Sequence, residues 1–212
     1  MSFSKFWNSS AKKYPVFTMV ITNGTLAATG NILAQSLSFF SDENKEKHKS
    51  FFEKFELSQT VRFFAYGMMF APFSFKWFSY LDRRFPFRSI SPSVKPKKNF
   101  AYWSVVGKRL SADQLLFSPL AAGAFIAVMG AMEKKSLQEI KERFNERYFK
   151  TLIGSYILWP AVQVINFSII PLIYRVPFAG VASVIWNCFL SILNARHKEN
   201  AFIAEELELL KG

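Results

Sequence analysis

Charged residues are missing from four long blocks of the chain, and this segregation restricts the possible folds more than any other feature. The blocks run from Tyr14 to Ser41, from Gln114 to Met132, from Thr151 to Tyr174 and from Val176 to Ala195. A helix that crosses a bilayer needs about 20 mostly apolar residues, within a range of roughly 17 to 25. The pattern therefore predicts an all-α fold, a polytopic membrane helix bundle.

The domain organisation follows from the same blocks. We expect a basic amino arm over residues 1–13 and a single integral membrane domain over residues 14–212. About four transmembrane helices are predicted, and a further apolar segment can span, re-enter or lie at the interface. The predicted spans are 15–38, 60–81, 113–132 and 151–174, and the further segment is 176–195.

The net charge is formally +12, with 27 Lys and Arg against 15 Asp and Glu. The loop over residues 82–109 contributes much of this excess, and its aromatic residues alternate with its cations, which also suits single-stranded nucleic acid. Because the loop lies between two predicted spans, we expect it to contact anionic headgroups of the lipid bilayer instead. No nucleic-acid partner is expected.

The charges of the loops predict a topology. The amino arm carries +3, the first loop is neutral, the second carries +7 and the third +2. Positive loops tend to share one side of a membrane, so the amino arm and the second loop should face the same compartment.

Residues for catalysis or cofactor binding are not recognisable. Cys188 is the only cysteine, and the two histidines, His48 and His197, lie in charged stretches. No glycine-rich phosphate loop, serine elbow, paired acid cluster or zinc-ligand spacing occurs. We therefore predict that the protein is not an enzyme and that it has no catalytic residues, cofactor or metal site.

Two helix starts are predicted from capping-box spacing. One is Ser111 to Gln114, just before the third apolar block, where Asp113 would also suit a helix amino end. The other is Ser136 to Glu139, which opens a charged helix expected to lie along the interface. The apolar face of that helix would carry Leu137, Ile140, Phe144 and Tyr148.

Polar residues form two stripes on the first predicted span. One stripe repeats with helical spacing at Thr18, Thr22, Thr25 and Thr29, and the other at Gly24, Ala28, Asn31 and Gln35. Such stripes can pack against neighbouring helices, or they can line a path for water. Both interpretations remain open from the sequence.

Helix-breaking prolines interrupt the fourth predicted span. Pro160 and Pro171 should free the carbonyls of Tyr156 and Phe167 inside the membrane, where unsatisfied polar groups cost several kcal/mol. Gln163 and Asn166 lie on one helical face, and we expect them to supply the missing hydrogen bonds or to line a pore. A break is also predicted at Arg175, whose side chain we expect to reach toward the headgroups, so that Arg175→Lys would be tolerated.

The segment WPAVQVINFSIIPLIYRV, followed by WNCFLS, resembles the carboxyl-terminal signature of the Mpv-seventeen and peroxisomal membrane protein family. Residues that match upstream, such as KKYPVFT, Gly67, Trp77 and Asp113, extend the resemblance over nearly the whole chain. The signature positions, for which the resemblance implies structural roles, are Trp159, Pro160, Phe167, Pro171, Arg175, Trp186 and Asn187. The chain departs from the family at Asn31, Phe75 and Tyr156, where relatives usually carry aspartate, histidine and tryptophan.

The resemblance implies a four-span protein of the mitochondrial inner or peroxisomal membrane, with a small-solute channel in some members. The acid-free basic amino arm favours the mitochondrial inner membrane. In one hypothesis the bundle, or a small homo-oligomer of it, encloses a channel or otherwise supports metabolite homeostasis. In the alternative, the protein is a non-conducting structural or partner-binding element. The candidate polar seam or pore lining comprises Gln163, Asn166, Thr18, Thr22, Thr25, Thr29, Asn31 and Gln35.

Overall fold

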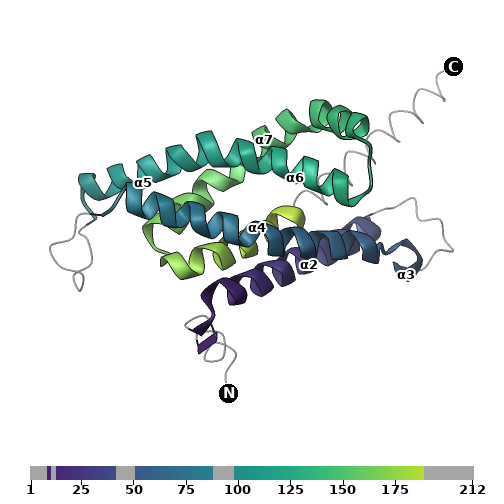
Figure 1. Ribbon diagram of the computed structural model, residues 1–212, viewed down its shortest axis with the longest axis horizontal. Coiled ribbons are helices and arrows are strands. Elements are labelled where there is room, and N and C mark those ends of the chain that lie inside the picture. The colour runs from purple at the N-terminus through teal and green to yellow at the C-terminus, as the bar shows by residue number, and fades with distance from the viewer. Residues whose placement is uncertain (1–8, 11–12, 42–50, 88–97, 189–212) are drawn as a thin grey trace.

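The computed structural model describes residues 9–10, 13–41, 51–87 and 98–188, and every regular element in those ranges is a helix. The long helices lie side by side and run alternately in opposite directions along the molecule (Figure 1). In chain order the elements are α2 (Pro15–Ser41), α3 (Phe51–Lys54), α4 (Leu57–Arg84), α5 (Phe100–Ala112), the π-helix η1 (Asp113–Phe117), α6 (Ser118–Met132), α7 (Leu137–Ser168) and an apolar helix Leu172–Cys188.

Helices α2 and α4 approach each other closely through glycine. A Cβ added at Gly67 would lie 2.8 Å from both the Ala27 Cβ and the Asn23 carbonyl oxygen, and 3.1 Å from the Gly24 Cα. The Asn23 side chain also donates a hydrogen bond of 3.0 Å to the Gly67 carbonyl. Close backbone approach and interhelical hydrogen bonds are how helices associate in lipid, so this part of α2 packs against a neighbouring helix.

The third apolar helix is longer than the sequence predicts. Helix α5, η1 and α6 form one uninterrupted helix of 33 residues from Phe100 to Met132. The Asn99 side chain caps it by accepting a hydrogen bond of 3.1 Å from the Tyr102 backbone N–H. The predicted start at Ser111 is therefore wrong, because Asp113 follows α5 without a break and begins the π-helix instead.

The predicted capping box at Ser136 is confirmed. The Ser136 side chain accepts from the Glu139 backbone, and the Glu139 carboxylate accepts from the Ser136 N–H at 2.8 Å. The helix that follows is not a separate connector, because it packs against α6 and continues into the next apolar block, while its position at the interface stays a prediction. Its Ile140 side chain comes so close to Gly130 that a Cβ there would lie only 2.8 Å from it.

Helix α7 passes through Pro160 without ending, and it stops at Ser168. Ile169, Ile170 and Pro171 form the turn to the next helix, which begins at Leu172. The predicted single span over residues 151–174 is therefore divided in two. Pro171 stands just before a helix start, a position where proline's fixed φ is tolerated, rather than inside a helix.

The last described helix, Leu172–Cys188, lies against the first. A Cβ added at Gly180 would lie 2.7 Å from the Asn23 side-chain oxygen, and one added at Gly30 would lie 3.2 Å from the Val184 Cα. Residues 189–195 of the predicted apolar segment fall outside the described residues. A buried cluster joins the long helices, and it comprises Met19, Ala71, Phe78, Leu81, Tyr102, Val106, Phe167 and Val176.

Two of the described helices, Pro15–Phe40 and Phe100–Met132, are both long and apolar enough to cross a membrane. The helix Leu172–Cys188 is apolar but shorter. Large apolar side chains face outward, as at Leu120 and Ile157, which are 72% and 77% exposed. Such outward apolar faces are typical of helices that lie in lipid. The all-α membrane class is confirmed, while the number of four spans stays a prediction.

Candidate polar seam between the helices

A carboxylate lies at the point where three helical segments meet. Asp113, at the start of η1, is 2% exposed. Its Oδ1 accepts a hydrogen bond of 2.9 Å from the indole N–H of Trp77 on α4, and its Oδ2 accepts one of 3.0 Å from the Gln163 amide on α7. Gln114 donates a third hydrogen bond, of 2.9 Å, to Oδ2. The acid is thus held by donors from all three segments.

One further amide extends this network. Asn166, which is fully buried, donates to the Gln163 side-chain oxygen at 2.8 Å. Two buried amide oxygens, Gln114 Oε1 and Asn166 Oδ1, have no hydrogen-bond partner within the described part of the chain. We refer to these five residues as the polar seam: Trp77, Asp113, Gln114, Gln163 and Asn166.

The π-helix places the seam residues. Its wider turn breaks the regular spacing of the helix, and such segments occur often at functional sites. Tyr156 on α7 donates its hydroxyl to the Gln114 backbone carbonyl at 2.9 Å, and this hydrogen bond joins α7 to the π-helix. On the α4 side, the Trp77 and Phe117 rings are stacked with centroids 5.3 Å apart. The same tryptophan therefore packs on one η1 residue and binds another.

The predicted role of Gln163 and Asn166 in satisfying the freed carbonyls is wrong. Their amide donors bind Asp113 and each other instead. At the end of α7, the Ser168 carbonyl accepts a hydrogen bond from the Tyr102 hydroxyl, and the Ile170 carbonyl accepts one of 3.1 Å from Arg175. The hydroxyl of Tyr102 and the guanidinium of Arg175 thus donate to the backbone carbonyls at the end of α7 and in the turn that follows.

Arg175 makes contacts inside the bundle that the sequence did not predict, and its position relative to the headgroups stays a prediction. The residue is only 4% exposed, and its Nη1 lies 2.7 Å from Asp82 Oδ1. Arg109, 2% exposed, contacts the same carboxylate oxygen. The predicted break exists, but it falls before this residue, at Ile169–Pro171. We refer to Asp82, Arg109 and Arg175 as the arginine cluster.

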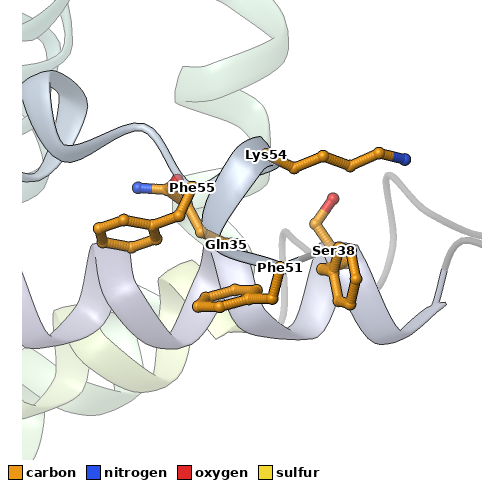
Figure 2. A pocket seen from close by; sticks show the side chains of 6 residues that line it. Gln35, Ser38, Phe51, Lys54 and Phe55 are labelled. Carbon is orange, nitrogen blue, oxygen red and sulfur yellow. The ribbon is translucent and has the colours of Figure 1, made fainter. Parts of the chain in front are cut away.

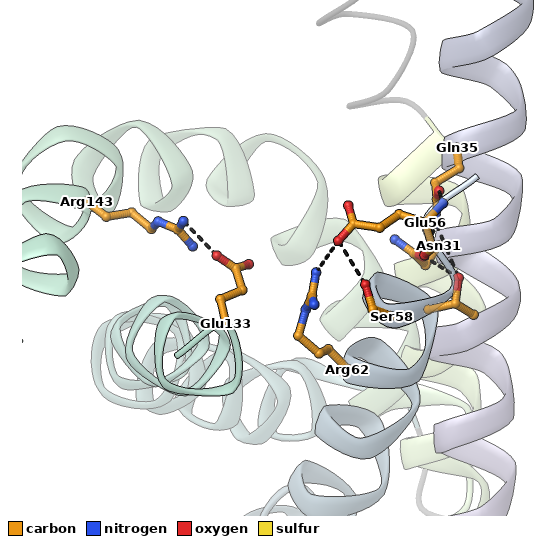
Figure 3. A network of polar contacts seen from close by, with 8 residues as sticks. Asn31, Gln35, Glu56, Ser58, Arg62, Glu133 and Arg143 are labelled. Atoms are coloured by element: carbon orange, nitrogen blue, oxygen red, sulfur yellow. Dashed lines mark hydrogen bonds and ion pairs between the residues drawn. The ribbon is translucent and has the colours of Figure 1, made fainter. Parts of the chain in front are cut away.

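Asn31 and Gln35 belong to a different polar group, near the amino end of α4 (Figure 3). Asn31 Oδ1 accepts from Gln35 at 2.7 Å and from the Thr60 hydroxyl at 2.9 Å. The Gln35 side-chain oxygen accepts from the Glu56 N–H at 2.8 Å, so Gln35 ties α2 to the start of α4. Glu56 binds Arg62 at 2.8 Å, and this pair, which holds the carboxylate charged, lowers the Glu56 pKa.

A small pocket of about 220 Å³ lies beside this polar group, between the end of α2 and α3 (Figure 2). It is lined by Gln35, Ser38, Phe39, Phe51, Lys54 and Phe55. The pocket is at one end of the bundle and does not reach the polar seam.

The predicted threonine stripe is not brought into the seam. Thr25 and Thr29 are exposed, and each donates its hydroxyl to a carbonyl of its own helix, four residues earlier. Thr18 is buried and does the same toward Tyr14. Thr22 is half-buried on the same helix. Of the eight predicted lining residues, only Gln163 and Asn166 therefore lie in one network with the buried acid.

The signature positions have structural contacts. Phe167 is buried edge-to-face against Phe78, and Trp186 lies against Gly154. Asn187 faces Gly30, whereas Trp159 is half-buried. Pro160 and Pro171 take the helix positions given above.

Sequence reasoning did not assign five residues to these sites. Trp77 was noted only as a match to the family. Asp113 and Gln114 were assigned to a helix start, and Asp82 and Arg109 to the basic loop. The detectable signal was Asp113 itself, an acid directly joined to a long apolar block. No group of three or more metal-ligating side chains occurs among the residues that the structure describes.

Antiparallel apolar helices with an acid and three amides buried between them define a polytopic α-helical membrane protein. A family model described as the Mpv17 / PMP22 family matches residues 130–191. Protein SYM1 of Gibberella zeae is 36% identical, and the match covers 92% of this chain and 99% of that protein. Protein SYM1 of Kluyveromyces lactis is 32% identical over 91% and 90% of the two chains. The chain belongs to the Mpv17 / PMP22 family.

Another relative carries a different name within the same group. PXMP2/4 family protein 4 of Dictyostelium discoideum is 29% identical, and the match covers 89% of this chain and 91% of that protein. No solved structure matches the fold.

Proposed function

We propose that the protein provides a path for small solutes across its membrane and that the polar seam is where this path closes. The observation that carries the proposal is the Asp113 carboxylate, which lies next to a charge-free helix and is held by Trp77 and Gln163. Ionisable groups at membrane depth are costly, and those that face a bundle interior commonly mark solute or ion pathways.

The two unpartnered amide oxygens support the same role. Buried polar atoms are nearly always hydrogen-bonded in folded proteins, so an unmet acceptor suits transient water or solute. Gln114 Oε1 and Asn166 Oδ1 are two such acceptors beside one acid. The acid and the three amides of the seam are at most 8% exposed and Trp77 is half-buried, so the proposed path is closed in this arrangement.

A non-conducting role is the second candidate, and a specific observation favours it. The polar side chains of the seam bind one another, as Gln163 does with Asp113 and Asn166. In this second role, the network does nothing more than fix how α4, η1 and α7 pack. In that case the function would be carried by partners of the protein.

Single-channel recording from purified protein in planar bilayers separates the two candidates. For a path through the seam, Gln163→Leu and Asn166→Leu should leave folded protein whose unitary conductance falls, because an apolar surface in a narrow path favours dewetting. For packing alone, each change should cost about 0.6 to 2 kcal/mol of stability and leave any current unchanged. Gln138→Leu, on the exposed start of α7, is the matched control. A parent protein that never conducts would remove the channel proposal.

The remaining aspects of function are proposed with it. We place the protein in the mitochondrial inner membrane, with the peroxisomal membrane as the alternative, because its amino arm is basic and acid-free. Its role would be passive passage rather than catalysis, and a small homo-oligomer could enclose the path. Immunolabelling of fractionated organelles tests the location, and sizing in detergent tests the assembly.

A further inference from the structure

The arginine cluster begins one helical turn before Asp113, where the Asp113 backbone N–H donates to the Arg109 carbonyl, and it has an unusual balance of charge. Two guanidinium groups, of Arg109 and Arg175, contact one oxygen of a single carboxylate, Asp82 Oδ1. The two arginine side chains are 2% and 5% exposed, whereas the Asp82 side chain is 27% exposed. The three side chains together therefore keep one positive charge in excess where water has little access.

The neighbouring groups fix the arginines but do not neutralise them. Arg109 donates from Nε and Nη2 to the Phe85 carbonyl at 3.1 and 2.8 Å, and its guanidinium lies 4.4 Å from the centre of the Phe87 ring. Arg175 donates from Nε to the Ile170 carbonyl and lies over the Phe167 ring at 5.5 Å. Carbonyls and ring faces attract a cation but carry no net negative charge.

Two guanidinium nitrogens of the cluster have no hydrogen-bond partner within the described chain: Arg109 Nη1, which only forms the ion pair with Asp82, and Arg175 Nη2. In Arg175, Nε and Nη1 are both used. A guanidinium presents paired donors in a fixed plane that match the oxygens of a phosphate or carboxylate. The two N–H groups of Arg175 Nη2, called the free edge of Arg175 below, are thus chemically suited to an anionic oxygen.

The depth of the cluster indicates which anions reach it. The helix Phe100–Met132 has 33 residues and so rises about 50 Å, whereas the hydrocarbon core is about 30 Å thick. The charge-free part of this helix begins at Gln114, so Arg109 lies on the part that extends toward the headgroups. In Figure 1 the start of α5, the end of α4 and the turn after α7 lie at the same end of the molecule.

We propose that the arginine cluster is a binding site for a phosphate-type anion, which takes the free edge of Arg175 beside Asp82. The site uses none of the side chains of the seam, so it does not depend on whether the protein conducts. The ligand neutralises the excess charge and ties the end of α4 to the last helix. A phospholipid headgroup and a soluble phosphate share this chemistry, and the experiment distinguishes them.

The test uses the full-length protein in neutral phosphatidylcholine nanodiscs and follows thermal unfolding by tryptophan fluorescence. One arm adds inorganic phosphate to the buffer, and the other replaces part of the lipid with phosphatidic acid. We expect a rise in Tm that saturates in at least one arm. A response to phosphatidic acid alone assigns the site to a headgroup, whereas a response to inorganic phosphate assigns it to a soluble anion. No response in either arm overturns the proposal.

Two variants separate a built site from general attraction of charge. Arg175→Gln should weaken apparent binding at least tenfold, whereas Arg83→Gln, which removes the same charge from an exposed position on α4, should change it less than twofold. Equal losses in both variants would overturn the proposal. If Arg175→Gln fails to fold, Asp82→Asn decides. Removing that carboxylate leaves two unpaired arginines, so the anion should raise Tm by more than in the parent protein, and an equal or smaller rise overturns the site.

Discussion

Trp77 donates its indole N–H to the buried carboxylate of Asp113 at 2.9 Å and thereby joins α4 to the π-helix of another segment. The two residues are 36 positions apart in the sequence. Trp77 is thus the donor that α4 contributes to the acid, beside Gln114 and Gln163.

Replacing Trp77 with phenylalanine should remove this hydrogen bond while keeping an aromatic ring over Phe117. A buried charged acceptor that loses a donor costs about 1 to 3 kcal/mol, and we expect that loss in the free energy of unfolding in detergent. Trp103→Phe, on a residue that is 47% exposed, is the control and should change stability little. Equal stability of the two variants would show that the indole N–H contributes nothing.

Gly67→Ala should disrupt the pairing of α2 and α4, because the added methyl would lie 2.8 Å from backbone and side-chain atoms of α2. We expect a lower melting temperature and less folded protein. Gly107→Ala is the matched control on α5, where a Cβ meets nothing within 4 Å. It should stabilise the helix by about 0.5 to 1 kcal/mol, so the two substitutions are predicted to differ in sign.

Arg175→Lys should destabilise the protein, although the sequence alone suggested that it would be tolerated. A lysine ammonium is a point charge and cannot donate to the Ile170 carbonyl and Asp82 with the planar geometry of a guanidinium. We expect a loss of about 1 to 3 kcal/mol, measured by chemical unfolding in micelles. Arg83→Lys, at an exposed position, should unfold like the parent protein. A fully stable Arg175→Lys variant would contradict the buried placement.

The start of α7 should show a dependence on pH. Hydrogen bonds from Lys135 and Ser136 lower the pKa of Glu139 from its ordinary value of 4.5 to about 2. Since the folded pKa is the lower one, the carboxylate contributes stability above pH 4.5, and this contribution is lost as pH falls toward about 2. The difference in stability between parent and Glu139→Gln should therefore narrow over that interval. A constant difference would mean that the charge of Glu139 is irrelevant to the cap.

The topology predicted from loop charges can be read by labelling in sealed vesicles. In a Cys188→Ser background, single cysteines at Ser10 and Ser93 should react with an impermeant maleimide from the same side. A cysteine at Lys134, in the turn between α6 and α7, should react from the other side. Labelling of Ser10 and Ser93 from opposite sides would refute the predicted topology.

The helices could be predicted well because segregation of charge reports directly on the solvent of each segment. Where local signals compete, the prediction failed. Ser111 has the spacing of a capping box, but Asn99 caps the helix in fact, because α5 packs against other helices and extends the apolar helix backward. Tertiary contacts of Tyr102 and Val106 decide this start, and a local pattern contains no information about them.

The polar seam could be predicted only in part from the sequence, for a similar reason. Gln163 and Asn166 were recognisable as polar residues in an apolar block, but their partner Asp113 lies on a distant segment. Which faces meet depends on the π-helix, whose altered turn shifts the register of every later residue. The departure at Tyr156 shows the same limit, since its hydroxyl contact with the Gln114 carbonyl becomes evident only when the two helices are placed together.

The contact between the first and last described helices has a consequence for biogenesis. Gly30 and Gly180 bring α2 against Leu172–Cys188, so the surface of α2 that faces Val184 is completed only by residues made at the other end of the described chain. During insertion, α2 and α4 can pair early, as can α6 and α7, but α2 must wait in the membrane for its last neighbour. Because an added Cβ at Gly180 would lie 2.7 Å from Asn23, substitutions there should lower the yield of folded protein before they act on any activity.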